Sequence, residues 1–390
     1  MVIAGLINMP QYKFNQEQWK YTKISNFDKF DFNHKQSSFY NKEIINQNCI
    51  IKIKNRKFNI SNINESNIFV SDLKYASKNK FLYFDLFFNK IIQNQDNPFI
   101  ELNKKNHANG LFLYIKDNTI LSKPIIIKTN SNKINDDIME SERLFLGIGK
   151  NVSATIFIEE EILNKCNLNT VTELFIDKNS KINLIHLSDK PNVTQIHNFA
   201  SLINNASSLH YIPIDVSGKL IKKNFYCNLN QPQSSCYFES LNILNGNNYI
   251  DNFIKINHCK KNTFSSTNHK NILKDKATGI FNAKAIISKN SMNSEANQSN
   301  KNLMLSDKAT IYSNPQLEIY NNDVRCSHGS TTGEIDKDAL FYMQSRGIKP
   351  SDCKKIILKG FADEITNKIK NTYIKNIITK KINNWFSDNN

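Results

Sequence analysis

The fold is decided by short apolar runs that follow one another in the middle of the chain: Lys223-Asn-Phe-Tyr-Cys-Asn-Leu229, Ser235-Cys-Tyr-Phe-Glu-Ser-Leu241 and Tyr249-Ile-Asp-Asn-Phe-Ile-Lys-Ile-Asn257. Each has the length of a β-strand, and turn-forming residues separate it from the next. Similar runs extend in both directions, at Leu111–Ile115, Pro124–Lys128, Leu144–Ile148, Thr155–Ile158, Val171–Ile176, Ile182–Leu187, Leu209–Ile214, Gly279–Ile287 and Gln316–Tyr320. The sequence therefore predicts a mainly β core over residues 105–335.

About a dozen short strands without a helical period between them fit two architectures, a sandwich or barrel and a β-helix solenoid. Between residues 110 and 320, Asn245-Gly246 is the best candidate for a hairpin turn, and it stands nearly alone. A parallel β-helix uses its turns to join coils, so a hairpin-poor β sequence favours it. The pattern alone leaves both architectures open.

The two ends of the chain lack the strand pattern of the middle. Residues 1–104 are irregular and predict a mixed, partly helical region, with short helical stretches at Gln16–Tyr21 and Ser71–Ser77. Residues 336–390 predict helices. Asp336 is a good N-cap for Lys337–Arg346, Gly347 ends that helix, and Ser351 or Asp352 caps a second one.

The predicted C-terminal helices carry apolar stripes. At helical spacing the sequence places Ile357, Phe361, Ile365 and Ile369, and then Ile374, Ile378, Ile382 and Phe386. Such stripes either pack on the end of the chain's own β core or offer a face to a partner chain. The pattern is compatible with both.

The composition narrows the class of protein. Lys and Arg number 51 against 35 Asp and Glu, a net charge of +16, but Arg occurs only at positions 56, 143, 325 and 346. A lysine surplus without arginine clusters is a poor surface for nucleic acids, because arginine reads bases and clamps phosphates. The Asn-, Ile- and Lys-rich composition is typical of A/T-rich codons, so we expect no nucleic-acid partner.

Cysteine usage and the start of the chain indicate the compartment. The seven cysteines, at positions 49, 166, 227, 236, 259, 326 and 353, form no Cys-x-x-Cys pair and suit reduced thiols. Met1–Asn8 lacks the features of a signal peptide. No apolar run approaches the ~18 residues of a membrane span. We therefore expect no membrane association, and a cytoplasmic or plastid-like location.

The most unusual stretch is Asp323-Val-Arg-Cys-Ser-His-Gly329. If it is extended, Cys326 and His328 project from the same face of a strand. A thiolate beside an imidazole suits iron–sulfur chemistry, zinc or copper, and also a Cys/His nucleophile pair. Two ligands do not complete a tetrahedral site. Either the remaining ligands come from elsewhere or from another chain, or both residues are structural.

Two weaker candidates lie upstream. His258 and Cys259 are neighbours on a predicted strand, so they face opposite sides and do not readily hold one ion together. The three acids Glu159–Glu161 are expected to form a solvated strand edge.

Nucleotide-binding and hydrolase motifs are missing. The sequence has no phosphate-cradling Gly-x-x-x-x-Gly-Lys-Ser/Thr, no Gly-x-Gly-x-x-Gly after a strand, and no Gly-x-Ser-x-Gly elbow. We expect the chain to bind no nucleotide and to be no enzyme. Two alternatives remain. A polysaccharide-active β-helix enzyme would need clustered acidic and basic side chains on one strand face, and a nucleic-acid-binding module would need salt-dependent binding.

Several segments together resemble the SufB/SufD family of the Suf iron–sulfur cluster assembly complex. The signature covers Asn314–Asp336 and is followed by Leu340–Ile348; upstream, Gln298–Ser306 and Gly279–Lys284 also match, with Ala283 where the family usually has glycine. Glu17–Thr22 is similar to an N-terminal element of the SufD branch. Cys-Ser-His-Gly at 326–329 also favours that branch.

The resemblance implies a right-handed parallel β-helix core with flanking helical regions, and a non-catalytic subunit that pairs with a SufB-like scaffold. It further implies that a SufC-like ATPase docks on the C-terminal helices, for which Ile357, Phe361, Ile365, Ile369, Ile374 and Ile378 are the candidate contacts. A transient Fe–S cluster or iron would be held at the partner interface. His328 is the first candidate residue for that site and Cys326 a weaker second.

Overall fold

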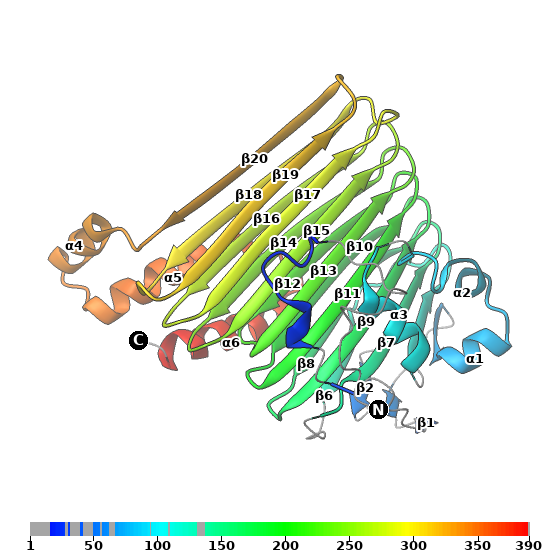
Figure 1. Ribbon diagram of the computed structural model, residues 1–390, viewed down its shortest axis with the longest axis horizontal. Coiled ribbons are helices and arrows are strands. Elements are labelled where there is room, and N and C mark those ends of the chain that lie inside the picture. The colour runs from blue at the N-terminus through cyan, green and yellow to red at the C-terminus, as the bar shows by residue number, and fades with distance from the viewer. Residues whose placement is uncertain are drawn as a thin grey trace.

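The computed structural model describes residues 16–27, 30–31, 40–41, 50–54, 57–61, 67–93, 95–107, 110–130 and 137–388. The expectations for Met1–Asn8 and Cys49 fall outside these residues. The described chain winds through two long sheets that face each other and are joined at their corners, with helices outside them (Figure 1). The predicted mainly β, parallel solenoid is confirmed.

Strands alternate between the two sheets along the chain. The 11-stranded sheet has the order β1-β3-β2-β6-β8-β10-β12-β14-β16-β18-β20 and the 9-stranded sheet β19-β17-β15-β13-β11-β9-β7-β5-β4. Among the strands that the structure describes, β2–β3 and β4–β5 pair antiparallel and the other pairs are parallel. The first sheet comprises β1 (Tyr40–Asn41), β2 (Ile50–Lys54), β3 (Lys57–Ser61), β6 (Ile125–Asn130), β8 (Ser153–Glu161), β10 (Lys181–Asp189), β12 (Ser208–Asp215), β14 (Ser235–Leu244), β16 (Phe264–Leu273), β18 (Ser294–Met304) and β20 (Val324–Gly333). The second comprises β4 (Ile68–Asp72), β5 (Leu111–Ile115), β7 (Glu140–Ile148), β9 (Cys166–Ile176), β11 (Val193–Ile203), β13 (Leu220–Leu229), β15 (Tyr249–His258), β17 (Thr278–Ile287) and β19 (Thr310–Ile319).

The corners explain why the chain coils instead of folding back. Most coils turn at a residue with positive φ, usually asparagine, which tolerates the left-handed conformation; these are Asn118, Asn151, Asn179, Ala206, Gln233, Asn262 and Asn293. Stacked corner amides bond to each other, as from Asn151 Nδ2 to Asn118 Oδ1 at 2.7 Å. Gly246 also has positive φ. It lies between β14 and β15, which belong to different sheets and do not pair with each other. Asn245-Gly246 is therefore a corner and not a hairpin.

The strands are apolar on both faces because both faces are covered. In β10, Ile182 and Leu184 point into the lumen between the sheets, while Ile185 and Leu187 point outward into a cluster shared with the C-terminal helices. These two faces account for the nearly continuous apolar runs in the sequence.

The C-terminal helices are α4 (Lys337–Ser345), α5 (Pro350–Thr366) and α6 (Thr372–Asp388). The Asp336 carboxylate caps α4, as predicted, and Gly347 follows with φ +86°. The expected cap of the second helix is wrong: α5 begins at Pro350 with Lys349 as N-cap, so Ser351 and Asp352 lie inside its first turn. Proline suits that first position because it needs no amide hydrogen there.

In the N-terminal region, residues 16–22 lie on the outer face of the 9-stranded sheet. Gln18 Nε2 donates to the Tyr226 hydroxyl at 2.7 Å, and Thr22 Oγ1 donates to Asp251 at 2.5 Å. Residues 16–22 form turns and not the predicted helix; the described helices here are the 3₁₀ helix η2 (Ile24–Asn26), α1 (Leu73–Lys78), α2 (Leu82–Phe87) and α3 (Pro98–Asn106). Strands β2 and β4 show that the sheets begin before residue 105.

Candidate functional site at the end of the solenoid

The last coil, made of β19 and β20, differs from the coils before it. Each strand is the terminal member of its sheet, so one backbone edge has no neighbouring strand in the described part of the chain. Figure 1 shows β20 as the outermost strand of the solenoid. Most β20 side chains are exposed, whereas the preceding β18 buries every second side chain. The solenoid therefore ends in an uncovered coil.

Cys326 and His328 lie on the lumenal face of this coil. The register pairs Cys326 with Ala296 and His328 with Gln298 in β18. Ala296 and Gln298 are buried in the lumen, and stacked positions of a parallel sheet face the same side. Cys326 and His328 therefore share one face, with nothing of the described chain stacked above them.

Strand β19 forms the opposite wall of this open end. The Ser313 and Ser330 hydroxyls meet at 2.8 Å across the lumen. Counting from that pair toward the connecting corner places Leu317 opposite Cys326. Cys326 accordingly packs on a small apolar cluster with Leu317 and Val324.

The two candidate ligands differ in their environments. Burial raises the pKa of the Cys326 thiol, and the Glu295 charge adds to this, although a contact with the Ala296 backbone lowers it. Cys326 is therefore a thiol at neutral pH and a weaker ligand than a thiolate. His328 is exposed. Among residues that the structure describes, no group of three or more His, Cys, Asp or Glu side chains is arranged to hold a metal ion.

The other Cys/His pair forms no site. His258 is buried, and its Nδ1 and Nε2 lie 2.8 Å from the hydroxyls of Thr263 and Ser265. Burial lowers the pKa of His258 to about 4. Cys259 lies half-buried at the corner beyond the strand. His258 is a satisfied core residue.

Of the three acids Glu159–Glu161, Glu161 is exposed as expected, but the expected solvated position is wrong for Glu160. Glu160 points into the lumen and is 5% exposed. Its carboxylate pairs with the Lys190 ammonium and lies 2.9 Å from His186 Nε2. Burial would raise the pKa of Glu160, but Lys190 and His186 outweigh this effect and hold that pKa well below its usual range.

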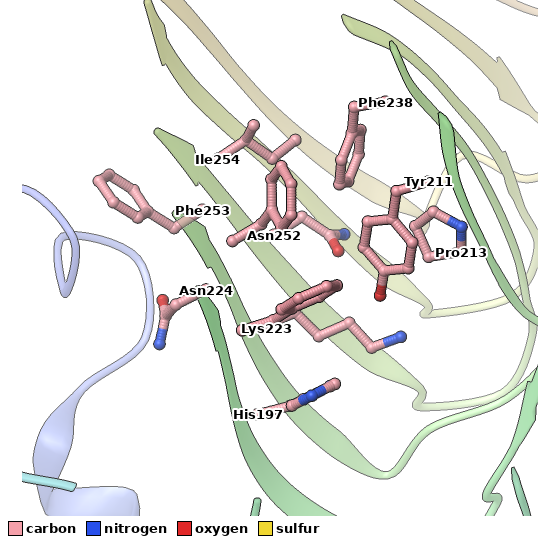
Figure 2. A pocket seen from close by; sticks show the side chains of 11 residues that line it. His197, Tyr211, Pro213, Lys223, Asn224, Phe238, Asn252, Phe253 and Ile254 are labelled. Atoms are coloured by element: carbon pink, nitrogen blue, oxygen red, sulfur yellow. The ribbon is translucent and has the colours of Figure 1, made fainter. Parts of the chain in front are cut away.

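The lumenal charges continue to a small cavity of about 20 Å³, whose lining residues are drawn in Figure 2. His197, Tyr211, Lys223 and Asn252 supply its polar groups. The Lys223 Nζ lies 2.6 Å from Asp215 Oδ2, and burial lowers the pKa of His197 well below its ordinary value. A cavity of this size has room for about one water. The clustered acids and bases are thus sealed in the core, out of reach of a polysaccharide.

Four of the proposed ATPase contacts are buried in the chain itself: Ile365, Ile369, Ile374 and Ile378. They share one apolar cluster with outward-facing residues of the 11-stranded sheet. Ile357 and Phe361 are half-buried, and the Lys270 ammonium lies 4.1 Å from the centre of the Phe361 ring. In this structure the stripe covers the solenoid.

Helix α4 carries the two most exposed large apolar side chains of the described C-terminal region. It stands beside the end of the sheet (Figure 1), and Phe341 and Tyr342 are 75% and 60% exposed. A groove of about 540 Å³ separates α4 and α5 from the end of β18; it is lined by Lys274, Met304, Leu305, Ser306, Asp307, Glu334, Ile335, Lys337, Leu340, Pro350, Ser351, Lys354 and Leu358.

Comparison with known proteins decides the family. A family model described as "SUF system FeS cluster assembly, SufBD core domain" matches residues 129–361. The chain belongs to the SufBD family. That span includes most of the solenoid and both candidate ligands of the open end.

Three of the similar proteins, two bacterial and one from a plant, show the extent of the match. SufD of Escherichia coli K12 is 31% identical over 186 residues, which are 48% of this chain and 44% of that protein. A SufBD family protein of Synechocystis is 28% identical over 287 residues, covering 70% of this chain and 62% of the relative. The chloroplastic protein ABCI7 of Arabidopsis thaliana is 24% identical over 278 residues, 68% of this chain and 58% of that protein. The match thus spans only part of each relative, between 44% and 62% of its length.

The search for membrane spans gave a negative result within the described ranges: no helix there is both long and apolar enough to cross a bilayer.

Proposed function

We propose that this SufBD family chain is a non-catalytic subunit of a Suf iron–sulfur assembly complex, and that a SufB-like chain covers its open solenoid end. The observation that carries the proposal is the uncovered last coil, where Cys326 and His328 lie on the lumenal face with no coil stacked above them. In this proposal the chain works in the cytoplasm or in a plastid-like compartment and binds neither nucleotide nor nucleic acid.

The open end is suited to strand-mediated pairing. Terminal strands β19 and β20 offer backbone amides and carbonyls to another chain, and proteins normally cover or blunt such edges. The half-buried cluster of Leu317, Val324 and Cys326 supplies apolar area beside those edges. A second solenoid stacked here would bury both.

We assign to His328 the role of a ligand for the cargo, which is iron or the nascent iron–sulfur cluster. A neutral imidazole ligates iron through one ring nitrogen, and a partner thiolate at the same interface would provide a second ligand. Iron or the nascent cluster is then shared between two chains, which accounts for the absence of a complete ligand set among the described residues. Cys326 is a secondary candidate because its thiol stays protonated.

A SufC-like ATPase is the partner we assign to the C-terminal helices, and we place its contact on α4 and the adjoining groove. The buried stripe of α5 and α6 already packs on the solenoid, while Phe341 and Tyr342 remain exposed. Large exposed apolar side chains next to a groove mark interaction surfaces. ATP hydrolysis would belong to that partner.

Replacement of His328 tests the cargo site. In a complex purified with its SufB-like and SufC-like partners, His328→Ala should remove cluster assembly, followed by absorbance and circular dichroism, while leaving complex formation unchanged. Thr332→Ala, on the same face of β20, is the matched control and should assemble clusters normally. Assembly at the wild-type rate in His328→Ala would show that the histidine has no role in it.

Replacement of Val324 tests the pairing surface separately. Val324→Asp places a charge in the apolar part of the open end, so it should abolish capture of the SufB-like chain. Because Val324 is half-exposed, the isolated variant should keep the wild-type circular dichroism spectrum. Undiminished capture by the folded variant would contradict pairing at this end.

A further inference from the structure

A buried acceptor without a partner lies directly beneath His328. Gln298 is 6% exposed, and its Nε2 donates to the Gln316 carbonyl oxygen at 3.2 Å. Its Oε1 is buried and makes no hydrogen bond to any residue that the structure describes. Buried side-chain acceptors are normally satisfied, so this atom calls for a donor.

The register shows which donor is available. Gln298 in β18 pairs with His328 in β20, and both side chains point to the lumenal face. Neighbouring strands lie about 4.8 Å apart, so side chains at paired positions stack on each other. The imidazole of His328 is therefore the polar group stacked on the Gln298 amide from the open side.

We propose that Gln298 is a positioning residue for His328: its Oε1 accepts a hydrogen bond from one imidazole N–H and so fixes the tautomer of the ring. The other ring nitrogen then carries the lone pair and faces out of the open end. This inference rests on the proposed function, because a fixed tautomer matters only if His328 ligates cargo there.

The direction of the hydrogen bond follows from the second contact of Gln298. A glutamine amide has a donating end and an accepting end. The donating Nε2 is already committed to the Gln316 carbonyl across the lumen. The atom of this amide that lacks a hydrogen bond is the oxygen, and an oxygen accepts but does not donate. A hydrogen bond between the two side chains therefore needs an imidazole N–H as its donor, which ligating histidines commonly give to a neighbouring acceptor.

The tautomer is measurable in the isolated full-length chain. In ¹⁵N-labelled protein at pH 8, two-bond ¹H–¹⁵N spectra should show one His328 tautomer dominating by about tenfold. In Gln298→Leu the ratio should fall to that of an exposed histidine in a short peptide. Gln298→Glu keeps an acceptor at this place and should keep the wild-type tautomer. Asn297→Ala, whose side chain points outward, is the matched control.

Two results would overturn the inference. One is an ordinary tautomer mixture in the wild-type chain, a measurement that needs no variant and so does not depend on how Gln298→Leu folds. The other is an unchanged ratio in a folded Gln298→Leu chain.

Cluster assembly separates this inference from the proposed function. In the complex, Gln298→Leu should slow assembly by about 10-fold or more, as loss of a residue that orients a ligand typically does. The double variant with His328→Ala should be no slower than His328→Ala alone. If Gln298 fixes the tautomer but His328→Ala assembles clusters normally, the proposed function fails while the positioning contact stands.

Discussion

The middle of the solenoid and its last coil have the same backbone but different surroundings. In the middle, outward side chains such as Ile185 and Ile212 are covered by α5 and α6, and lumenal side chains are covered by the next coil. In the last coil, the lumenal Cys326 and His328 have a coil beneath them and none above. Side chains of the middle coils are therefore covered by protein on both sides, whereas those of the last coil are covered on one side.

The middle coils therefore contribute to stability, whereas the last coil is available for binding another chain. Residues of the middle coils can be changed only at the expense of packing, since each contacts protein on both sides. Residues of the last coil contact protein on one side and are free to meet another chain. Replacing an apolar side chain should therefore lower stability in the middle coils, but weaken partner binding in the last coil.

The largest expected effect is on stability in the covered region. Ile378→Ala removes a fully buried side chain beneath the solenoid face, and should lower the free energy of unfolding by about 2–5 kcal/mol. Leu317→Ala in the last coil is the comparison, and should cost under about 1 kcal/mol in the isolated chain while weakening capture of the SufB-like partner. Urea denaturation measures the loss of unfolding free energy in both variants. Equal losses of stability would mean that the last coil is as well covered as the middle.

The packing of Ile378 also predicts that deletion of residues 351–390 destabilises the solenoid itself.

The next effect is on the pH dependence of stability, which we expect to come from the middle coils. Burial lowers the pKa of His258 and His269 to about 4, whereas the unfolded chain titrates near pH 6.5. Between these values the unfolded state binds more protons, so the folded state loses about 1.4 kcal/mol per histidine for each pH unit of acidification. The unfolding free energy should therefore fall steadily from pH 6.5 to about 4.

A single variant isolates that contribution. His269 contacts Ser240 and Asn242 in the lumen, and His269→Asn removes its titration. The slope of unfolding free energy against pH should become shallower in a folded variant. A slope identical to the wild-type slope would show that His269 does not contribute.

A smaller effect is expected outside the solenoid, on ATPase capture. Replacing Phe341 and Tyr342 together with alanine should weaken binding of the SufC-like chain by about 10-fold or more, because exposed aromatic anchors dominate such interfaces. Their exposure predicts a change in the unfolding free energy of under about 0.5 kcal/mol. Tyr373→Ala, at a half-exposed aromatic on α6, is the control. Weakening by Tyr373→Ala alone would move the contact to α6.

The smallest effect is expected at Cys326. Cys326→Ser keeps the shape of a protonated thiol, so cluster assembly in the complex should fall by less than about 10-fold. A loss as complete as in His328→Ala would make the cysteine an equal ligand, despite the raised pKa of its thiol.

The sequence predicted features that depend on near neighbours in the chain. The strand runs, the shared face of Cys326 and His328, and the Asp336 cap all follow from spacings of a few residues. Glu160 was misread because its partner Lys190 lies one coil further along, and no local pattern announces that pairing. The apolar stripe of Ile365 and Ile378 left two partners open for the same reason, since its contacts are far away in sequence.

The stacking order of the coils has a consequence for how the protein is made. A ribosome releases the chain from the N-terminus, so each coil emerges onto a finished edge of the one before, and the edge of β20 is the last to form. Helix α6 emerges later still, yet Lys381 returns to Glu161 and Asp189 at 2.6 Å. Until α6 has emerged, this part of the outer face of the early coils stays bare. The nascent chain therefore passes through an aggregation-prone stage that outlasts the completion of β20 and ends when α6 packs on the early coils.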